Sequence, residues 1–264
     1  MRSAVHALMQ ASLLLLLAIV MTPASSQVAE RIAVSADTVV STPLGPVRPS
    51  QLLIQDGFRR LNIKDIGLPQ VTSIAAASSR VESLFFAAES SFIKDGAPFR
   101  YGTIIEANGS FSQASITDLL PFSEAVGIRA LSQGENGVYI VPDTIVESDL
   151  GVIRPQDIVF VSESGNLRYF DGSESGLPPA ARIAAFDVFD STTVFLVFDT
   201  HLEIDGTFFA RGDVIKFTNA SQPRFSKYLT KHRILGPCET CSVTSISIEA
   251  DKDIIFKDAF YSPW

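Results

Sequence analysis

Residues 193–217, TVFLVFDTHLEIDGTFFARGDVIKF, contain the pattern on which the rest of the chain is built. An apolar run at 194–198 is followed by an acid and a hydroxyl, Asp199 and Thr200. A connection with a glycine and an arginine comes next, and a second strand-like run, 213–217, ends the pattern. The same order of features occurs three more times upstream, which indicates a repeat protein.

The acid recurs at steps of 52, 54 and 56 residues, and a hydroxyl follows it each time. A glycine and then an arginine follow in every copy. A fixed period of about fifty residues sets the architecture of a chain, so it is interpreted before any local motif. The acids are Asp37, Glu89, Asp143 and Asp199, the glycines are Gly45, Gly96, Gly151 and Gly206, and the arginines are Arg48, Arg100, Arg154 and Arg211.

From residue 29 onward the sequence predicts strands and turns with almost no helix. Short runs rich in Val, Ile and Phe alternate with Asn-Gly, Asp-Gly and Gly-Pro turn signals. Each unit is expected to hold four strands, a to d. Strand a is predicted at 74–77, 128–131 and 183–188, strand b at 84–88, 138–141 and 194–198, strand c at 103–106, 157–161 and 213–217, and strand d around 111–116, 166–170 and 224–229.

Strand b is apolar at consecutive positions, which indicates that both of its faces are covered. Four-stranded units of this length, repeated around an axis, describe an all-β fold, the β-propeller, in which radial repetition leaves only short edges. The rival folds are a β-sandwich and a stacked β-solenoid. A solenoid normally has a shorter period, and a sandwich does not explain why the four features recur in phase.

The two ends of the chain predict how the ring closes. The first unit starts at its b strand, residues 32–36, and therefore lacks strand a. Residues 242–249, SVTSISIE, are similar to the other a strands and are expected to complete this unit. That gives four blades. The alternative is five, with residues 253–260 as part of an additional blade.

The phased pattern of Asp-Thr, Gly, Arg and Asp-[Ile/Val]-x-Phe resembles the repeats of exported bacterial proteins of unknown role. More loosely, it resembles β-propellers in general. The resemblance covers about residues 35–260. It implies a scaffold and no particular activity, because propellers host many unrelated functions.

Composition limits the classes of partner. The chain has 264 residues, 46% of them hydrophobic, a formal net charge of -8 and a sequence pI near 4.9. Nucleic-acid binders usually carry a basic stripe, and none is present here. We therefore expect neither nucleic acid nor an anionic membrane surface as a partner.

The first 26 residues have the features of a secretory signal peptide. Arg2 precedes an apolar run at 12–21 with five consecutive leucines, and small residues follow at 24–26. This run is shorter than the roughly 20 residues that a membrane span needs. We expect cleavage after Ser26, a single β-propeller domain at 27–264 without a membrane span, and a secreted or periplasmic location.

Six acids are candidate binding residues. Asp37, Glu89, Asp143 and Asp199 end strand b, and Asp157 and Asp213 begin strand c, so all are expected at one end of the blades. A ring of carboxylates could bind Ca²⁺, which prefers six to eight oxygen ligands, or a cationic partner. In the alternative, each acid caps the connection between strands b and c by accepting backbone N–H groups, or pairs with the arginine of its own repeat.

Two further features are candidates for covalent modification. Cys238 and Cys241 are the only cysteines, and in an exported protein this pair predicts a disulfide. Asn108-Gly109-Ser110 and Asn219-Ala220-Ser221 are N-glycosylation sequons, which serve as turn residues where that modification does not occur.

Function is predicted at the level of class. A nucleophilic hydrolase is disfavoured because G-x-S-x-G is absent. We expect an exported, non-catalytic module that binds a protein or carbohydrate without a cofactor. The alternative is an extracellular carbohydrate-active enzyme that uses a pair of carboxylates. A catalytic site would break the repeat symmetry, whereas most of the acids keep the phase.

Overall fold

The computed structural model describes most of the repeat region. The described residues are 30–42, 44–56, 60–69, 74–80, 83–107, 110–122, 126–219, 224–235, 241 and 243–250. They form one compact unit, Glu30–Glu249. The predicted signal peptide at 1–26 and the segment at 253–260 lie outside the described residues, so both stay predictions.

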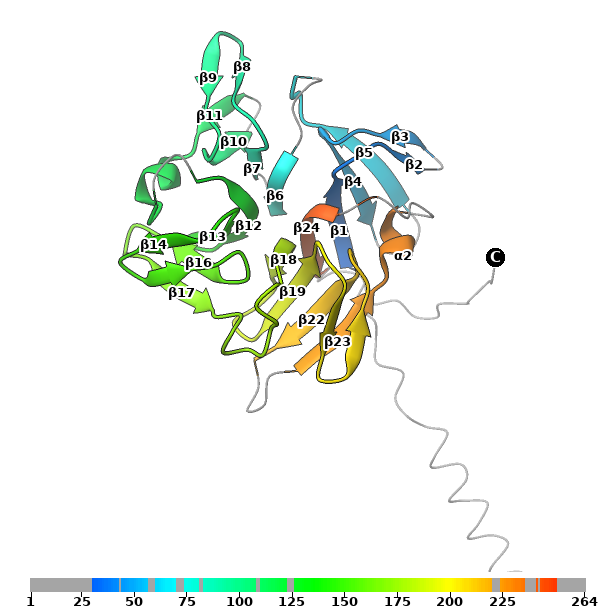
Figure 1. The fold of residues 1–264 in the computed structure, drawn as a ribbon. Coiled ribbons are helices and arrows are strands. Elements are labelled where there is room, and N and C mark those ends of the chain that lie inside the picture. The colour runs from blue at the N-terminus through cyan, green and yellow to red at the C-terminus, as the bar shows by residue number, and fades with distance from the viewer. Residues whose placement is uncertain are drawn as a thin grey trace, which may run out of the picture. The chain divides into compact units, whose positions relative to one another are not determined.

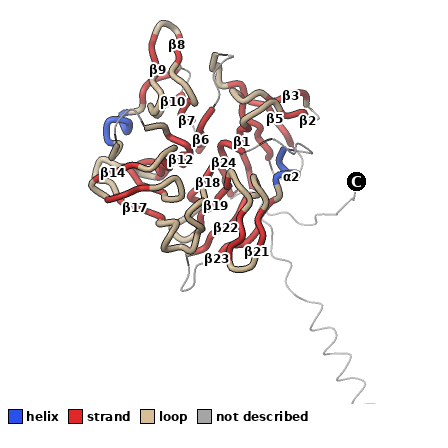
Figure 2. The backbone as a smooth tube through the Cα atoms, viewed as in Figure 1, coloured by secondary structure: helices blue, strands red, loops and turns tan. Residues whose placement is uncertain are grey.

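Four four-stranded antiparallel sheets stand in a ring, which makes the fold a four-bladed β-propeller (Figure 1). The prediction of an all-β propeller is confirmed. Strand β12 (Ile128–Gly134) contacts both β6 (Ile74–Arg80) and β18 (Ile183–Val188), so the a strands are the innermost strands of the blades. Figure 2 shows that strands dominate the described chain.

Each blade has the strand order a-b-c-d from the centre outward. Blade 1 consists of β24 (Val243–Ala250), β1 (Glu30–Ala36), β4 (Gln51–Asp56) and β5 (Arg60–Asp65). Blade 2 consists of β6, β7 (Ser83–Ala88), β10 (Ile105–Ala107) and β11 (Phe111–Gln113). Blade 3 consists of β12, β13 (Gly137–Pro142), β16 (Ile158–Val161) and β17 (Leu167–Phe170), and blade 4 of β18, β19 (Thr193–Phe198), β22 (Val214–Thr218) and β23 (Arg224–Leu229).

The ring is closed by strands from opposite ends of the chain. Strand β24 lies beside β1 and supplies the a strand that the first unit lacks. The Ser35 N–H donates a hydrogen bond to Ser245 Oγ at 3.0 Å, and the two hydroxyl oxygens are 2.7 Å apart. The prediction that residues 242–249 complete four blades is therefore confirmed.

Each connection between strands b and c folds into a two-stranded hairpin that was not predicted from the sequence. The four hairpins are β2 (Val40–Thr42) with β3 (Gly45–Val47), β8 (Phe92–Lys94) with β9 (Ala97–Phe99), β14 (Val146–Ser148) with β15 (Gly151–Ile153), and β20 (Leu202–Ile204) with β21 (Thr207–Phe209). The phased glycines lie in the turn or at the first residue of the second strand, and all four have positive φ, for example 82° at Gly96 and 73° at Gly206. Glycine adopts this conformation without steric cost, which explains why it recurs.

The core consists of apolar clusters between neighbouring blades. All six residues of β19 are buried, which confirms that strand b is covered on both faces. One cluster joins Ile158 and Phe170 of blade 3 to Phe186 of blade 4. Three further clusters join blades 4 and 1, blades 1 and 2, and blades 2 and 3. Burial of each large side chain contributes about 1.5–3 kcal/mol, so the blades stabilise one another.

Only two short helices occur in the described chain. The 3-10 helix η1 (Ser115–Leu119) begins two residues after β11, so the strand predicted around 111–116 is shorter than expected. The Thr117 hydroxyl accepts a hydrogen bond from the Ile104 N–H at 3.1 Å and fixes this turn. The other helix is α2 (Lys231–Leu235). Neither of these helices has the length and apolar character of a membrane span.

Candidate functional site on the b–c face

The b–c face is the end of the propeller at which strands b end and strands c begin. Asp143 lies here, after β13, and its carboxylate accepts hydrogen bonds from the Tyr101 hydroxyl and from the Gly127 N–H at 3.1 Å. A β-carbon at Gly127 would overlap Tyr101 and lie 2.6 Å from an Asp143 oxygen. Tyr101 belongs to the preceding repeat, so Asp143 connects blades 2 and 3.

Tyr101 is held in its protonated form. Burial raises its pKa to about 12, and the hydrogen bond to Asp143 and the negative charge of that carboxylate act in the same direction. The phenol therefore remains a hydrogen-bond donor to Asp143 well above neutral pH.

Asp199 makes the equivalent connection between blades 3 and 4. The Arg129 guanidinium on β12 pairs with one Asp199 oxygen, and Arg129 Nε donates to the Ile183 carbonyl at 3.1 Å. The other oxygen, Oδ1, is buried without a hydrogen-bond partner in the described structure. This arginine thus binds the neighbouring blade through both a carboxylate and a backbone carbonyl.

Asp37 connects blade 1 to blade 4. Its carboxylate lies 3.6 Å from Arg211 Nη2. Arg211 follows the end of its hairpin by two residues, as Tyr101 does, so the two side chains occupy the same repeat position. The other two blades have proline at this position, and the carbonyls of Pro49 and Pro155 accept N–H groups of the next blade, at 3.1 and 2.9 Å.

The arrangement in which each acid pairs with the arginine of its own repeat, one of the alternatives left open by the sequence, is not the one found for Asp37, Asp143 and Asp199. Their partners come from the preceding blade in the ring: Tyr101 and Arg211 follow a hairpin, and Arg129 lies on strand β12. Glu89, the fourth phased acid, is exposed.

Asp157 and Asp213 cap the start of strand c. Asp157 is fully buried and accepts the N–H groups of Arg154 at 2.8 Å and Gly172 at 3.0 Å. Asp213 accepts the N–H groups of Ala210 and Lys231, both at 3.2 Å, and pairs with Lys227 Nζ at 2.9 Å. These contacts are the backbone-capping arrangement that was the predicted alternative to ligand binding.

No group of three acidic, histidine or cysteine side chains in the described part of the chain is placed to hold a metal ion. Binding of Ca²⁺ or of a cationic ligand by the six acids stays a prediction.

The hairpins present a second set of candidate residues. Their inner faces are buried, as at Phe92 and Phe99, whose rings stack with centroids 5.1 Å apart. Their outer faces carry exposed apolar side chains, up to 69% exposed at Ile93 and 59% at Phe208. Of the seven large hydrophobic side chains found exposed in the described chain, six lie in the b–c connections, namely Val39, Leu44, Ile93, Ile145, Val152 and Phe208.

The outer faces differ between blades in charge. In the third hairpin Glu147 lies opposite Val152, and in the fourth Glu203 lies opposite Phe208. The first two hairpins have uncharged pairs at these positions. Those pairs are Ser41 with Pro46 and Ile93 with Pro98.

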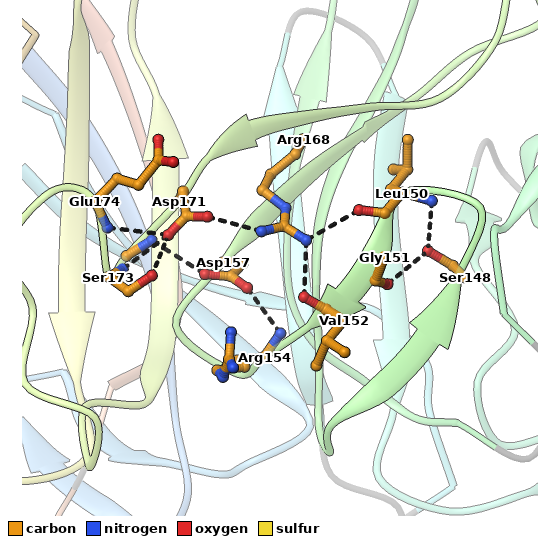
Figure 3. Close-up of polar contacts among 11 residues, drawn as sticks. Ser148, Leu150, Gly151, Val152, Arg154, Asp157, Arg168, Asp171, Ser173 and Glu174 are labelled. Carbon is orange, nitrogen blue, oxygen red and sulfur yellow. Dashed lines mark hydrogen bonds and ion pairs between the residues drawn. The ribbon is translucent and has the colours of Figure 1, made fainter.

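An arginine on β17 fixes the third hairpin (Figure 3). Arg168 Nη2 donates to the carbonyls of Leu150 at 3.0 Å and Val152 at 2.7 Å, and Nη1 pairs with Asp171 at 2.7 Å. Burial alone would raise the pKa of Asp171. Hydrogen bonds from Ser173, from the Glu174 N–H and from Arg168 outweigh this effect and lower the pKa to about 2.

A cavity of about 630 Å³ opens beside this hairpin and is lined by Leu120, Pro121, Phe122, Asp149, Leu150 and Asn166. Asn166 Nδ2 donates to the Leu119 carbonyl at 2.9 Å. Its Oδ1 is buried without a hydrogen-bond partner in the described structure. Asp149 supplies the one carboxylate of the lining and is exposed, and the lining residues other than Asp149 and Asn166 are apolar.

The fourth hairpin carries an aromatic pair. His201 stacks on Phe208 with ring centroids 5.6 Å apart and planes at 19°. Its Nδ1 accepts the Arg211 N–H at 3.1 Å, which orients the imidazole. One face of the exposed phenyl ring is therefore already covered.

The predicted covalent features are only partly described. Cys241 is buried, but Cys238 lies outside the described residues, so the disulfide stays a prediction. Asn219 is exposed after β22, and its N–H donates to the Thr192 carbonyl at 2.7 Å. Asn108 lies outside the described residues, and glycosylation of either asparagine stays a prediction.

Sequence reasoning did not single out the outer hairpin residues. A signal was present in residues 202–209, LEIDGTFF, where alternating residues flank an Asp-Gly turn. It was obscured because both hairpin faces contain apolar residues, so alternation between apolar and polar positions is weak.

No family model matches this chain, and no curated protein does. Among solved structures, it is similar to the extracellular domain assigned to a hybrid two component system of B. thetaiotaomicron, at 8% identity and a TM-score of 0.30 over 70% of this chain and 20% of that chain. A second match is YCF48 bound to a D1 peptide, at 8% identity and a TM-score of 0.29 over 69% of this chain and 64% of that one. An extracellular domain assigned to a one component system of B. thetaiotaomicron matches at 11% identity and a TM-score of 0.29, over 74% and 28%. The chain thus spans less than two thirds of each of these chains, and at such scores the matches carry no functional argument.

Proposed function

We propose that this protein is an exported, non-catalytic module that binds another protein through the outer faces of its b–c hairpins. The observation that carries this proposal is the concentration of exposed apolar side chains in the b–c connections, which hold six of the seven in the described chain. Single exposed apolar residues are normal on a protein surface. Their recurrence in all four connections is a property of the repeat.

Folding of the blades does not need these side chains. Each hairpin already buries an inner pair, such as Val146 with Ile153 or Leu202 with Phe209. The outer residues of each hairpin are left in water, and exposed apolar side chains that recur in this way can serve as anchors for a partner. Aliphatic and aromatic anchors with a polar rim are typical of protein interfaces.

A protein partner fits this chemistry better than a carbohydrate. The exposed residues are mainly aliphatic, and His201 covers part of the one exposed ring, that of Phe208. The carbohydrate-active alternative needs two carboxylates free to act as acid and base. No observation favours it, and Asp143 and Asp199 are engaged by Tyr101 and Arg129.

Site-specific photo-crosslinking tests the proposal. A benzophenone amino acid replaces Phe208 or Ile93 on the b–c face, and Arg224, an exposed residue at the opposite end of its blade, serves as the control. We expect the two hairpin positions to capture the same partner protein from the exported fraction of the source cells, and position 224 not to capture it. Capture at 224 alone, or capture of a glycan by the hairpins, would contradict the proposal.

Export rests on the predicted signal peptide at 1–26 and has its own test. Mass spectrometry of the protein outside the cytoplasm should find an N-terminus at Gln27. An intact N-terminus on a protein retained inside the cell would contradict export and leave the binding proposal standing.

A further inference from the structure

We propose that the cavity beside the β14–β15 hairpin binds a lysine or arginine side chain, and that the third and fourth hairpins select a cationic, apolar segment of the partner protein. This inference rests on the proposed function and specifies the chemistry of the partner.

The first step is the distribution of charge among the four connections. Residues 38–47 of blade 1 contain no charged side chain. In blade 2, Lys94 and Asp95 form an ion pair at 3.8 Å. Residues 144–153 contain two acids and no basic residue, and residues 200–209 contain two acids and one histidine. The apolar surface is therefore negatively charged only on blades 3 and 4.

The second step concerns the acids at the hairpin turns. The backbone conformation of the turn explains some of them but not all. Asp95 and Asp205 have φ of 52° and 50° and precede glycine, a pairing that tight hairpin turns favour. Asp149 differs, because it has no positive φ, and in its hairpin the Ser148 hydroxyl accepts the Leu150 N–H at 3.1 Å and donates to the Gly151 carbonyl at 3.3 Å (Figure 3). The Asp149 carboxylate is thus not used by the turn.

The third step is the chemistry of the cavity. Leu120, Pro121 and Phe122 form an apolar wall, against which the methylene stem of lysine or arginine can pack. Asp149 offers an exposed carboxylate as the acceptor. A cationic head group supplies several donors and no acceptor, so it complements acceptor oxygens.

The fourth step concerns rigidity. Arg168 holds the hairpin through two carbonyls, and Asp171 balances its charge. The site therefore remains acidic although an arginine lies next to the hairpin. A surface fixed in advance loses less conformational entropy on binding.

Charge also argues against two other occupants. The chain has a formal net charge of -8, so a second copy would place like charges together at this face. An anionic membrane would be repelled for the same reason. A basic protein segment satisfies both the apolar and the acidic parts of the surface.

Fluorescence anisotropy with two short labelled peptides tests the inference. In one peptide lysine alternates with valine, and in the other glutamate replaces each lysine. We expect the lysine peptide to bind the wild-type protein and the glutamate peptide not to bind. Asp149→Asn should weaken the affinity at least about tenfold, and Asp149→Lys should abolish binding, because a desolvated charge pair is lost.

The matched control is Asp95→Asn in the second hairpin, which removes a carboxylate from the equivalent turn but not from the cavity. Its affinity should stay within about twofold of the wild type. Thermal melting of each variant checks that it folds, which we expect because Asp149 is exposed.

Four outcomes would overturn the inference. These are equal binding of the two peptides, an unchanged affinity in Asp149→Lys, self-association of the wild type that Asp149→Lys abolishes, and binding to vesicles containing anionic lipid. If crosslinks at Phe208 capture a protein whose affinity does not change in Asp149→Lys, the proposed function stands and this inference falls. If the lysine peptide binds as expected but no protein is captured, the cavity is confirmed and the proposed function falls.

Discussion

The b–c face carries two sets of carboxylates with opposite surroundings. Asp143 and Asp199 lie between blades, where Tyr101 and Arg129 of the preceding blade bind them. Glu147 and Glu203 lie on the outer faces of hairpins, opposite Val152 and Phe208, and are exposed. Each set occupies a fixed position of the repeat, although the exposed acids occur only in blades 3 and 4, so position in the repeat alone does not distinguish a structural acid from a candidate binding acid. Their contacts do.

The difference separates stability from recognition. Removal of a group packed between blades leaves its partner without a hydrogen bond, which costs free energy of unfolding. Removal of an exposed hairpin side chain leaves the fold almost unchanged. We therefore predict that changes at the inter-blade contacts lower the free energy of unfolding. Changes at the exposed hairpin side chains should leave it almost unchanged.

The largest effect is expected from Gly127→Ala. The new β-carbon would overlap the Tyr101 hydroxyl and crowd Asp143, so this contact between blades 2 and 3 must separate. We expect a loss of about 3 kcal/mol in the free energy of unfolding, measured by denaturant titration. The control is Gly96→Asn in a hairpin turn, where nothing lies within 4 Å of the added β-carbon and asparagine tolerates positive φ. Equal losses of unfolding free energy in the two variants would contradict the distinction between inter-blade contacts and hairpin turns.

A smaller loss is expected from Arg129→Gln. The guanidinium pairs with Asp199, and both side chains are partly buried, at 27% and 22% exposed. Without it a carboxylate between blades loses its ion pair, at a cost of about 2 kcal/mol. Arg154→Gln is the matched control, because Arg154 is exposed, and it should change the free energy of unfolding by less than about 0.5 kcal/mol. An unchanged free energy of unfolding in Arg129→Gln would contradict the proposed role of the inter-blade contacts.

Asp171→Asn should change how stability depends on pH. The folded-state pKa of about 2 is below the ordinary value of 3.8, so Asp171 contributes stability that is present above pH 3.8 and is lost as the pH falls through 2. We expect the free energy of unfolding of the wild type to fall more steeply over this range than that of Asp171→Asn. Urea titrations at stepped pH measure the two slopes. Parallel curves would show that Asp171 does not hold Arg168 in the way described.

Much of the architecture could be predicted from the sequence because it follows from periodicity. The four phased acids located the ends of strands b, and the similarity of residues 242–249 to the other a strands predicted β24. The partners of the acids could not be predicted, because a repeat pattern does not say which blade edge meets which. Tyr101, Pro155 and Arg211 occupy one repeat position, yet only the side chains of Tyr101 and Arg211 contact an acid of the next blade, through a hydrogen bond and an ion pair respectively.

The candidate binding surface could not be predicted from the sequence for a different reason. Phe208 and Phe209 are adjacent and equally apolar, but one is exposed and the other is 1% exposed. Which of them faces water is fixed by the register of the hairpin, where Phe208 lies opposite Glu203 and Phe209 opposite Leu202. Composition does not contain that information.

The most direct measurement is the free energy of unfolding of a variant in which Ile93, Ile145, Val152 and Phe208 are all replaced by threonine. Because these four side chains are exposed, we predict a change below about 1 kcal/mol. Phe209→Ala on the inner face should cost about 3 kcal/mol or more in the same experiment. A loss of that size in the fourfold variant would show that the outer hairpin faces belong to the folded core and are not a surface left for a partner.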